Sequence, residues 1–198
     1  MIRRLATALW LVALPLRADV YPALHDVSGV GADDVLNIRE QPDAKSSIIG
    51  TLAADASGVE VIAVSGGWAL VNTDEGSGYV ALRYLTRSAA ADWNALQYPV
   101  SCLGTEPFWS LDVDPVAGII RFQTPEDEEP LLSPIAQTWP ALPWAPSVAV
   151  ALSDGMVVLA PADCSDGMSD RRYGISADIF LQDGDRQRLS GCCRIAAP

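Results

Sequence analysis

Histidine is almost absent from this 198-residue sequence, which contains only His25. That residue follows the amino-terminal apolar segment and lies outside both domains expected below. Catalytic triads and histidine-ligated metal sites therefore have no source of imidazole. The sequence also lacks a C-x-x-C pair for redox chemistry and a glycine-rich loop for phosphate. We expect no catalytic residue, no metal, no cofactor and no enzymatic activity.

Basic residues are also scarce. The 13 Lys and Arg residues stand against 25 Asp and Glu residues, which gives a formal net charge of −12. Loss of residues 1–18 would remove Arg3, Arg4 and Arg17 and leave a charge of −15. Nucleic-acid binding needs a cationic surface, and anionic lipid attracts basic segments. The charge balance thus argues against both kinds of partner.

Long apolar runs are missing except at the amino terminus. Residues 5–16 are apolar apart from Thr7 and Pro15, follow Arg3 and Arg4, and precede the small residue Ala18. Such a run is shorter than the roughly 20 residues that span a bilayer. The pattern is typical of a secretory signal peptide over residues 1–18, and an uncleaved anchor is the alternative. We expect a periplasmic or extracellular protein without a membrane span after cleavage.

The four cysteines all lie in the second half, as Cys102, Cys164, Cys192 and Cys193. An even number in an exported chain indicates disulfides. A bridge between the adjacent Cys192 and Cys193 would need a strained ring, so Cys102 and Cys164 should each join one of them. The sequence leaves open which takes which. A four-thiolate zinc site fits this spacing poorly.

Several short strand patterns occupy residues 26–87. They comprise VLNIRE at 35–40, SSIIGTL at 46–52, GVEVIAV at 58–64, GGWALV at 66–71 and GYVALRYL at 78–85. Alternating apolar residues and glycine-rich turns predict a small all-β barrel, with a tight hairpin at Gly66-Gly67 and one valine-rich strand over 58–64. Together these motifs resemble a bacterial SH3-like (SH3b) domain.

This resemblance implies a binding module for a cell-wall peptide or an envelope protein. Trp68, Tyr79 and Tyr84 are the aromatic residues that could line its groove, although Trp68 could equally belong to the core. Residues 88–100 follow as a linker, in which Ser88 and the pattern of 89–96 predict a short helix that ends before Pro99.

The second domain, residues 101–198, is also expected to be β. Six strand patterns predict an antiparallel barrel or meander joined by disulfides. The proline-rich segment 131–146 excludes a regular helix and predicts a loop that lays Trp139 and Trp144 on the sheet. The motifs CLGTEPFWSLDVD (102–114), CSDGMSDRRYG (164–174) and GCCR (191–194) resemble a poorly characterised exported bacterial domain, sometimes found near META/HslJ-like domains. The resemblance implies structural cysteines.

The segment CSDGMSDRRYG has two interpretations. Asp166, Asp170, Arg171 and the neighbouring Arg172 could form a ligand or ion site, since aspartate oxygens bind Ca²⁺. Alternatively, Asp and Ser side chains cap turn amides and Gly167 takes a left-handed conformation, which would make the loop structural. The EF-hand spacing is absent, so we favour the structural interpretation.

Taken together, the sequence predicts an exported, non-enzymatic binding protein of the bacterial envelope, with the SH3-like half as the recognition module. One alternative is an envelope hydrolase that uses Glu106 and an Asp of the second domain, because glycosidases use paired carboxylates. Another is a structural or scaffolding protein. The oligomeric state and the identity of the partner are not encoded in any pattern found.

The amino-terminal pattern generates the first testable prediction. Cleavage after Ala18 would make Asp19 the first residue of the mature protein, which should occur outside the cytoplasm. Amino-terminal sequencing of protein from fractionated native cells measures this. An intact Met1 on a cytosolic species would contradict the export hypothesis.

Overall fold

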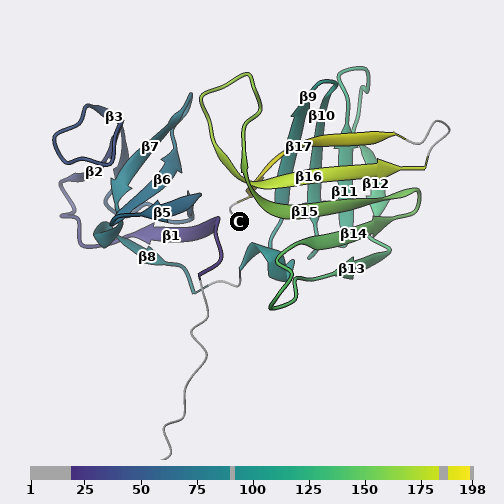
Figure 1. Ribbon diagram of the computed structural model, residues 1–198, viewed down its shortest axis with the longest axis horizontal. Coiled ribbons are helices and arrows are strands. Elements are labelled where there is room, and N and C mark those ends of the chain that lie inside the picture. The colour runs from purple at the N-terminus through teal and green to yellow at the C-terminus, as the bar shows by residue number, and fades with distance from the viewer. Residues whose placement is uncertain (1–18, 90–91, 183–186, 197–198) are drawn as a thin grey trace, which may run out of the picture.

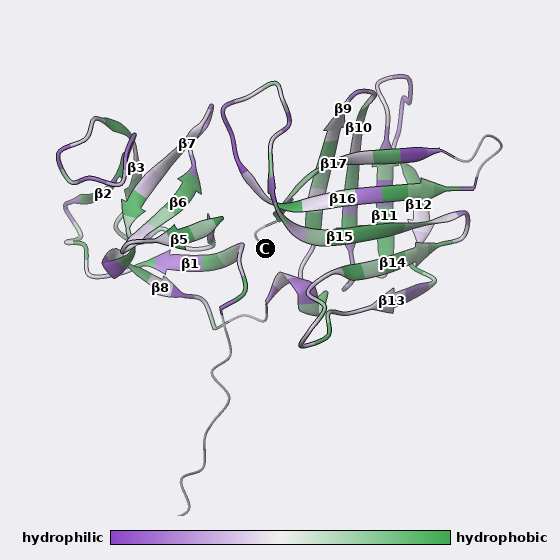
Figure 2. Cartoon of the chain, viewed as in Figure 1, coloured by the Kyte–Doolittle hydropathy of each residue, from purple (hydrophilic) through white to green (hydrophobic). Residues whose placement is uncertain are grey.

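The computed structural model describes residues 19–89, 92–182 and 187–196. The expected signal peptide, residues 1–18, lies outside the described residues. Strands dominate the described chain and fall into two groups, which Figure 1 shows side by side. Apolar residues gather on the strands of both groups (Figure 2). The all-β class predicted from the sequence is confirmed. In the described ranges, no helix has the length and apolar character needed to cross a bilayer.

The first domain contains eight short strands in two antiparallel sheets. The three-stranded sheet has the order β4-β1-β8, and the five-stranded sheet has the order β3-β2-β7-β6-β5. A 3-10 turn, η1 (Leu82–Tyr84), precedes the last strand. The strands are β1 (Ala23–Val27), β2 (Val35–Arg39), β3 (Ile48–Ala53), β4 (Val59–Val61), β5 (Ala63–Ser65), β6 (Trp68–Asn72), β7 (Ser77–Ala81) and β8 (Leu85–Arg87). Most of their buried apolar side chains form one core cluster, whereas Leu24 of β1 belongs to the cluster of the second domain.

The valine-rich segment 58–64 differs from the single strand that the sequence predicts. The adjacent residues Val61 and Ile62 are both buried, whereas Ala63 is exposed. The chain changes sheets here, because β4 pairs with β1 and β5 pairs with β6. Ile62 lies at the crossing and donates its backbone N–H to the carbonyl oxygen of Leu70 at 2.9 Å. The change of sheet breaks the two-residue alternation.

His25 belongs to the first domain, so its expected position outside both domains is wrong. It lies in β1, where it pairs with Val59 on one side and Arg87 on the other. Its side chain is 3% exposed, and burial lowers the pKa of the imidazole. The strand that opens the domain begins at Ala23, ahead of residue 26, where the sequence motifs start.

The linker contains a single 3-10 turn, η2 (Trp93–Ala95), instead of the predicted helix over 89–96. Residues 90–91 lie outside the described residues. Asp92 at the start of η2 makes no side-chain cap bond and instead pairs with Arg87 at 2.7 Å. Leu96 adopts a left-handed backbone, which ends the turn. Trp93 is 1% exposed and lies in the core of the second domain, so the linker packs on that domain.

The second domain is one antiparallel sheet of nine strands. Its order is β12-β11-β10-β9-β17-β16-β15-β14-β13. The strands are β9 (Val100–Thr105), β10 (Phe108–Asp114), β11 (Ile119–Gln123), β12 (Leu131–Pro134), β13 (Gln137–Trp139), β14 (Val148–Leu152), β15 (Gly155–Cys164), β16 (Tyr173–Leu181) and β17 (Arg188–Ile195). The two end strands, β12 and β13, are consecutive in the chain and only two residues apart. The sheet therefore curls into a half-barrel around the larger core (Figure 1).

Two expectations for this domain are wrong. Nine strands form instead of six, because β9 is a strand separate from β10 and the proline-rich segment contributes β12 and β13. Proline excludes a helix but is tolerated at a sheet edge, where Pro134 ends β12. Trp139 and Trp144 do not cover the sheet, since they are 44% and 79% exposed.

Trp109 explains why glycine occurs in two of the motifs. Its buried indole lies against Gly104 of β9 and Gly191 of β17. A Cβ atom on Gly104 would lie 2.1 Å from the indole Nε1, and one on Gly191 would lie 2.7 Å from Cζ2. Both distances are far below van der Waals contact, so the ring excludes a side chain at Gly104. At Gly191 the ring and the Leu103 carbonyl oxygen, 2.0 Å from such a Cβ atom, exclude one together.

Both disulfides predicted from the sequence are present, as Cys102–Cys193 and Cys164–Cys192, and no described cysteine is free. The strand register selects between the two open pairings. Cys193 lies directly opposite Cys102 in the β9–β17 ladder. Neighbouring side chains on a strand point to opposite faces, so Cys192 points away from Cys102 and reaches Cys164 at the end of β15.

The two bridges should contribute unequally to stability. A bridge lowers the entropy of the unfolded chain, and this loss grows with the number of residues in the closed loop. The sequence separations are 91 residues for Cys102–Cys193 and 28 for Cys164–Cys192. The double variant Cys102→Ala/Cys193→Ala should lose about 4.5 kcal/mol of unfolding free energy, against about 3.5 kcal/mol for Cys164→Ala/Cys192→Ala. Guanidinium unfolding of the three proteins measures this. A larger loss in the second variant would contradict the ranking.

Candidate binding groove between the domains

The loop 165–172, which joins β15 to β16, docks on the β6–β7 hairpin of the first domain. The Asn72 side-chain amide donates to the carbonyl oxygen of Arg172 at 2.9 Å. The backbone N–H of Arg172 donates to the Ser77 hydroxyl at 2.9 Å, and Arg171 Nη2 donates to the carbonyl oxygen of Asp74 at 2.7 Å. These bonds connect side chains to backbone, so they fix the position of the loop on the hairpin.

Further contacts hold the domains together away from this loop. The backbone N–H of Ile195, at the end of β17, donates to Glu60 Oε1 at 2.8 Å. Pro22 packs on Gly174 so closely that a Cβ atom there would lie 2.7 Å from the proline Cδ. Leu24 of β1 joins the core cluster of the second domain. The carboxyl-terminal end of the described chain accordingly lies between the domains in Figure 1.

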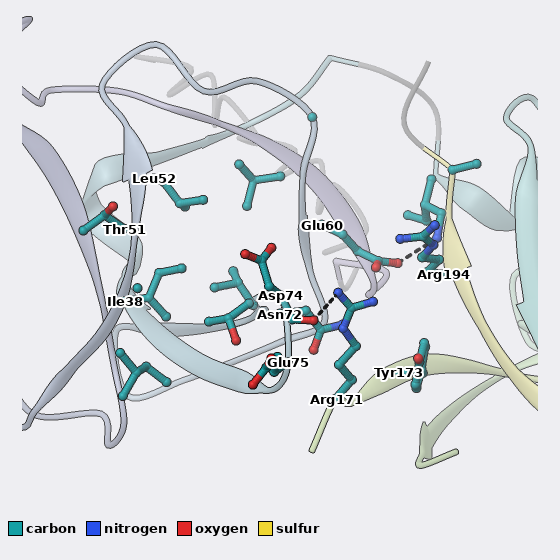
Figure 3. Close-up of a pocket in the computed structure, with 18 residues that line it drawn as sticks. Ile38, Thr51, Leu52, Glu60, Asn72, Asp74, Glu75, Arg171, Tyr173 and Arg194 are labelled. Atoms are coloured by element: carbon teal, nitrogen blue, oxygen red, sulfur yellow. Dashed lines mark hydrogen bonds between the residues drawn. The ribbon is translucent and has the colours of Figure 1, made fainter. Parts of the chain in front are cut away.

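A groove of about 980 Å³ remains between the two domains beside these contacts (Figure 3). Ile49, which is 44% exposed, and the half-buried Leu52 contribute apolar surface to it, whereas the lining residues Ile38 and Val71 belong to the buried core of the first domain. Its other first-domain residues are 50–51, 58–60 and 72–75, and its second-domain residues are Arg171, Tyr173, Arg194, Ile195 and Ala196.

The two domains contribute charges of opposite sign to the groove. The first domain contributes the carboxylates of Glu60, Asp74 and Glu75, and the second contributes the guanidinium groups of Arg171 and Arg194. Figure 3 draws Glu60 beside Arg194 where the two domains meet, and a dashed line marks the bond that the neighbouring Ile195 N–H donates to Glu60. A ligand that carries both an amine and a carboxylate could therefore find a partner for each charge.

Glu60 is the most perturbed acid of the groove. It lies on β4 between Val59 and Val61, and burial raises the pKa of its carboxyl to about 7, although the N–H of Ile195 and the charge of Arg194 oppose the shift. Near neutral pH the Glu60 carboxyl is thus partly protonated. A cationic ligand group beside it would favour the ionised form.

Asp166 has a structural role within its loop. Its carboxylate accepts hydrogen bonds from the backbone N–H groups of Met168 and Ser169, at 3.0 and 2.9 Å, and from the hydroxyls of Ser169 and Tyr173. Burial opposes its ionisation, but these hydrogen bonds together lower the pKa of Asp166. Gly167 takes the left-handed backbone, at φ +71°, that the sequence predicts.

The other residues named from the sequence are distributed over several surfaces. Arg171 lies in the interdomain groove. Tyr79 and Asp170 line a second hollow between the domains, of about 630 Å³. Trp68 and Tyr84 line a smaller hollow of about 300 Å³ on the first domain. The structure therefore does not bring the three aromatic residues together.

Glu60 and Arg194 are the groove residues that sequence reasoning missed. Glu60 is a single charge in the otherwise apolar segment GVEVIAV, and Arg194 directly follows the cysteine pair. The sequence contains both features, but only the fold brings the two residues close together. Glu106, the acid of the hydrolase alternative, is exposed on the turn between β9 and β10. Across the described residues, no three metal-ligating side chains cluster.

Comparison with known proteins bears on the first domain. The family model of the bacterial SH3 domain matches residues 34–86, from the residue before β2 to the middle of β8. Searches of the curated proteins and of the solved structures found no match. The SH3-like barrel is thus supported by sequence and by fold. The resemblance of residues 101–195 to an exported bacterial domain stays a prediction.

The raised pKa of Glu60 should make stability depend on pH. Between pH 4.5, its ordinary value, and about 7, the folded protein retains a proton that the unfolded chain releases. The unfolding free energy should therefore fall as pH rises through this window, by up to about 3 kcal/mol. The unfolding free energy of the variant Glu60→Gln should not show this fall.

Urea unfolding of both proteins at several pH values measures the difference. Glu126→Gln, at an exposed acidic position outside the groove, is the matched control and should keep the wild-type slope. Equal pH profiles for wild type and Glu60→Gln would contradict the burial of the Glu60 carboxyl.

Proposed function

We propose that this protein is a non-enzymatic binding protein of the bacterial envelope, and that its ligand is a peptide held in the groove between the two domains. The ligand is either a cell-wall peptide or a segment of an envelope protein. In this proposal the SH3-like domain supplies most of the groove, and the second domain supplies the cationic wall.

Two findings support the envelope setting. The first domain matches the bacterial SH3 family, whose members are generally binding modules. The two disulfides are compatible with an exported protein, because such bridges persist in oxidising compartments. The amino-terminal pattern of residues 1–18 leads to the same expectation.

The arrangement of charge in the groove carries the proposal. An apolar surface bordered by charges of both signs is what a short peptide needs, since its side chains bury apolar area while its amines and carboxylates stay paired. Arg194 is exposed, and its guanidinium can form charge-assisted hydrogen bonds with a ligand carboxylate. Glu60, Asp74 and Glu75 offer the complementary site for an amine.

Substitution in the groove should weaken binding. The probes are soluble peptide fragments from digested cell walls and a library of random ten-residue peptides with free carboxyl termini. For any probe that binds, Arg194→Gln and Glu60→Gln should each raise Kd roughly tenfold to a hundredfold, because each removes a charged hydrogen-bonding group. Isothermal titration calorimetry measures the change.

Arg121→Gln is the matched control, since Arg121 is exposed on β11 outside the groove. It should bind as the wild type does. The proposal fails if neither probe binds, or if both groove variants bind with wild-type affinity. Cell-wall degradation by the wild type that is lost in Glu106→Gln would establish the hydrolase instead.

A further inference from the structure

The groove lies between two strand edges that have no partner strand. Within the part of the chain that the structure describes, β3 ends the five-stranded sheet and pairs with β2 alone, and β4 ends the three-stranded sheet and pairs with β1 alone. The groove is lined by consecutive residues of both segments, 49–52 and 58–60. Alternate residues would line it if it lay over a face of the sheet, so consecutive residues place it against the edges.

β3 differs from every other end strand in the described chain. Strands β4, β5, β8 and β13 have three residues each, and β12 has four and ends on Pro134. β3 has six residues, with the sequence IIGTLA, and contains neither proline nor charge. Its residues Ile48 and Ile49 are 54% and 44% exposed. Proteins normally shorten, charge or cover such an edge, because it invites pairing with another chain.

We propose that β3 is a docking edge, on which an extended segment of a partner protein adds as a sixth strand within the interdomain groove. This inference rests on the proposed function and names its ligand class. Main-chain hydrogen bonds to β3 supply affinity, and alternate side chains point toward the apolar lining of the groove or toward its charged residues. The segment carries a basic side chain for Glu60 and a carboxylate for Arg194.

Charge favours a different protein over a second copy of this chain as the occupant. The chain has a formal net charge of −12, so two copies repel each other. The groove lining also carries three carboxylates against two guanidinium groups, so one further cation would balance its charge, and β3 itself contains none. A partner segment with a basic residue supplies that cation.

The test uses the full chain and the library of random ten-residue peptides, with the cell-wall peptide fragments as the competing probe. A peptide selected on the wild type should slow hydrogen exchange of the backbone amides in β3. Methylation of the peptide's own backbone nitrogens, one at a time, should weaken binding at least about tenfold at every second position, since alternate N–H groups face β3. Thr51→Lys places a charge on the edge and should weaken binding by a similar factor.

Thr138→Lys is the matched control, because Thr138 is an exposed threonine on the end strand β13. It should bind as the wild type does. If cell-wall fragments bind in dependence on Glu60 and Arg194 and the library yields no binder, the proposed function stands and strand addition is overturned. Peptide binding without protection of β3, or without the two-residue pattern, also overturns it. A dimer of the wild type that Thr51→Lys dissociates would assign the edge to self-association instead.

Discussion

The docking of loop 165–172 on the β6–β7 hairpin determines the geometry of the whole molecule. The loop is held at one end by the Cys164–Cys192 bridge and internally by the hydrogen bonds to Asp166, so its backbone is preorganised. Asn72 and Ser77 bind that backbone from the first domain. The interdomain groove exists because this contact, with those of Glu60 and Pro22, sets the two domains at a fixed spacing.

In this arrangement each half of the chain contributes a different part of the groove. The SH3-like domain provides the unpaired edges of β3 and β4, with the apolar side chains of Ile49 and Leu52 and the three carboxylates beside them. The second domain is a half-barrel whose strands β9, β15 and β17 the disulfides cross-link, and it contributes two arginines to the groove. Neither half alone forms the charge arrangement. The binding role that the sequence attributes to the first domain is therefore proposed for the pair.

Much of the fold follows from the sequence because its signals are local. Gly66 and Gly67 form the expected hairpin with positive φ angles, and the cysteines pair as one of the two predicted alternatives. The sequence-based predictions fail where a contact between residues far apart in the sequence determines the local structure. The chain changes sheets at Ile62, the second core buries Trp93 of the linker, and sheet closure recruits the proline-rich segment as edge strands. The site depends on such contacts throughout. Arg171 was predicted as a ligand residue, whereas Glu60 and Arg194 are 134 residues apart and meet only through domain packing.

The central claim is that the ligand lies between the domains, and chemical-shift mapping tests it most directly. Spectra of the full chain would be recorded with a bound cell-wall fragment or a bound library peptide. We predict that the largest shifts fall on residues 49–52 and 58–60 together with Arg171 and Arg194. Shifts centred on Trp68 and Tyr84, with the interdomain residues unchanged, would contradict the account and place recognition on the first domain alone.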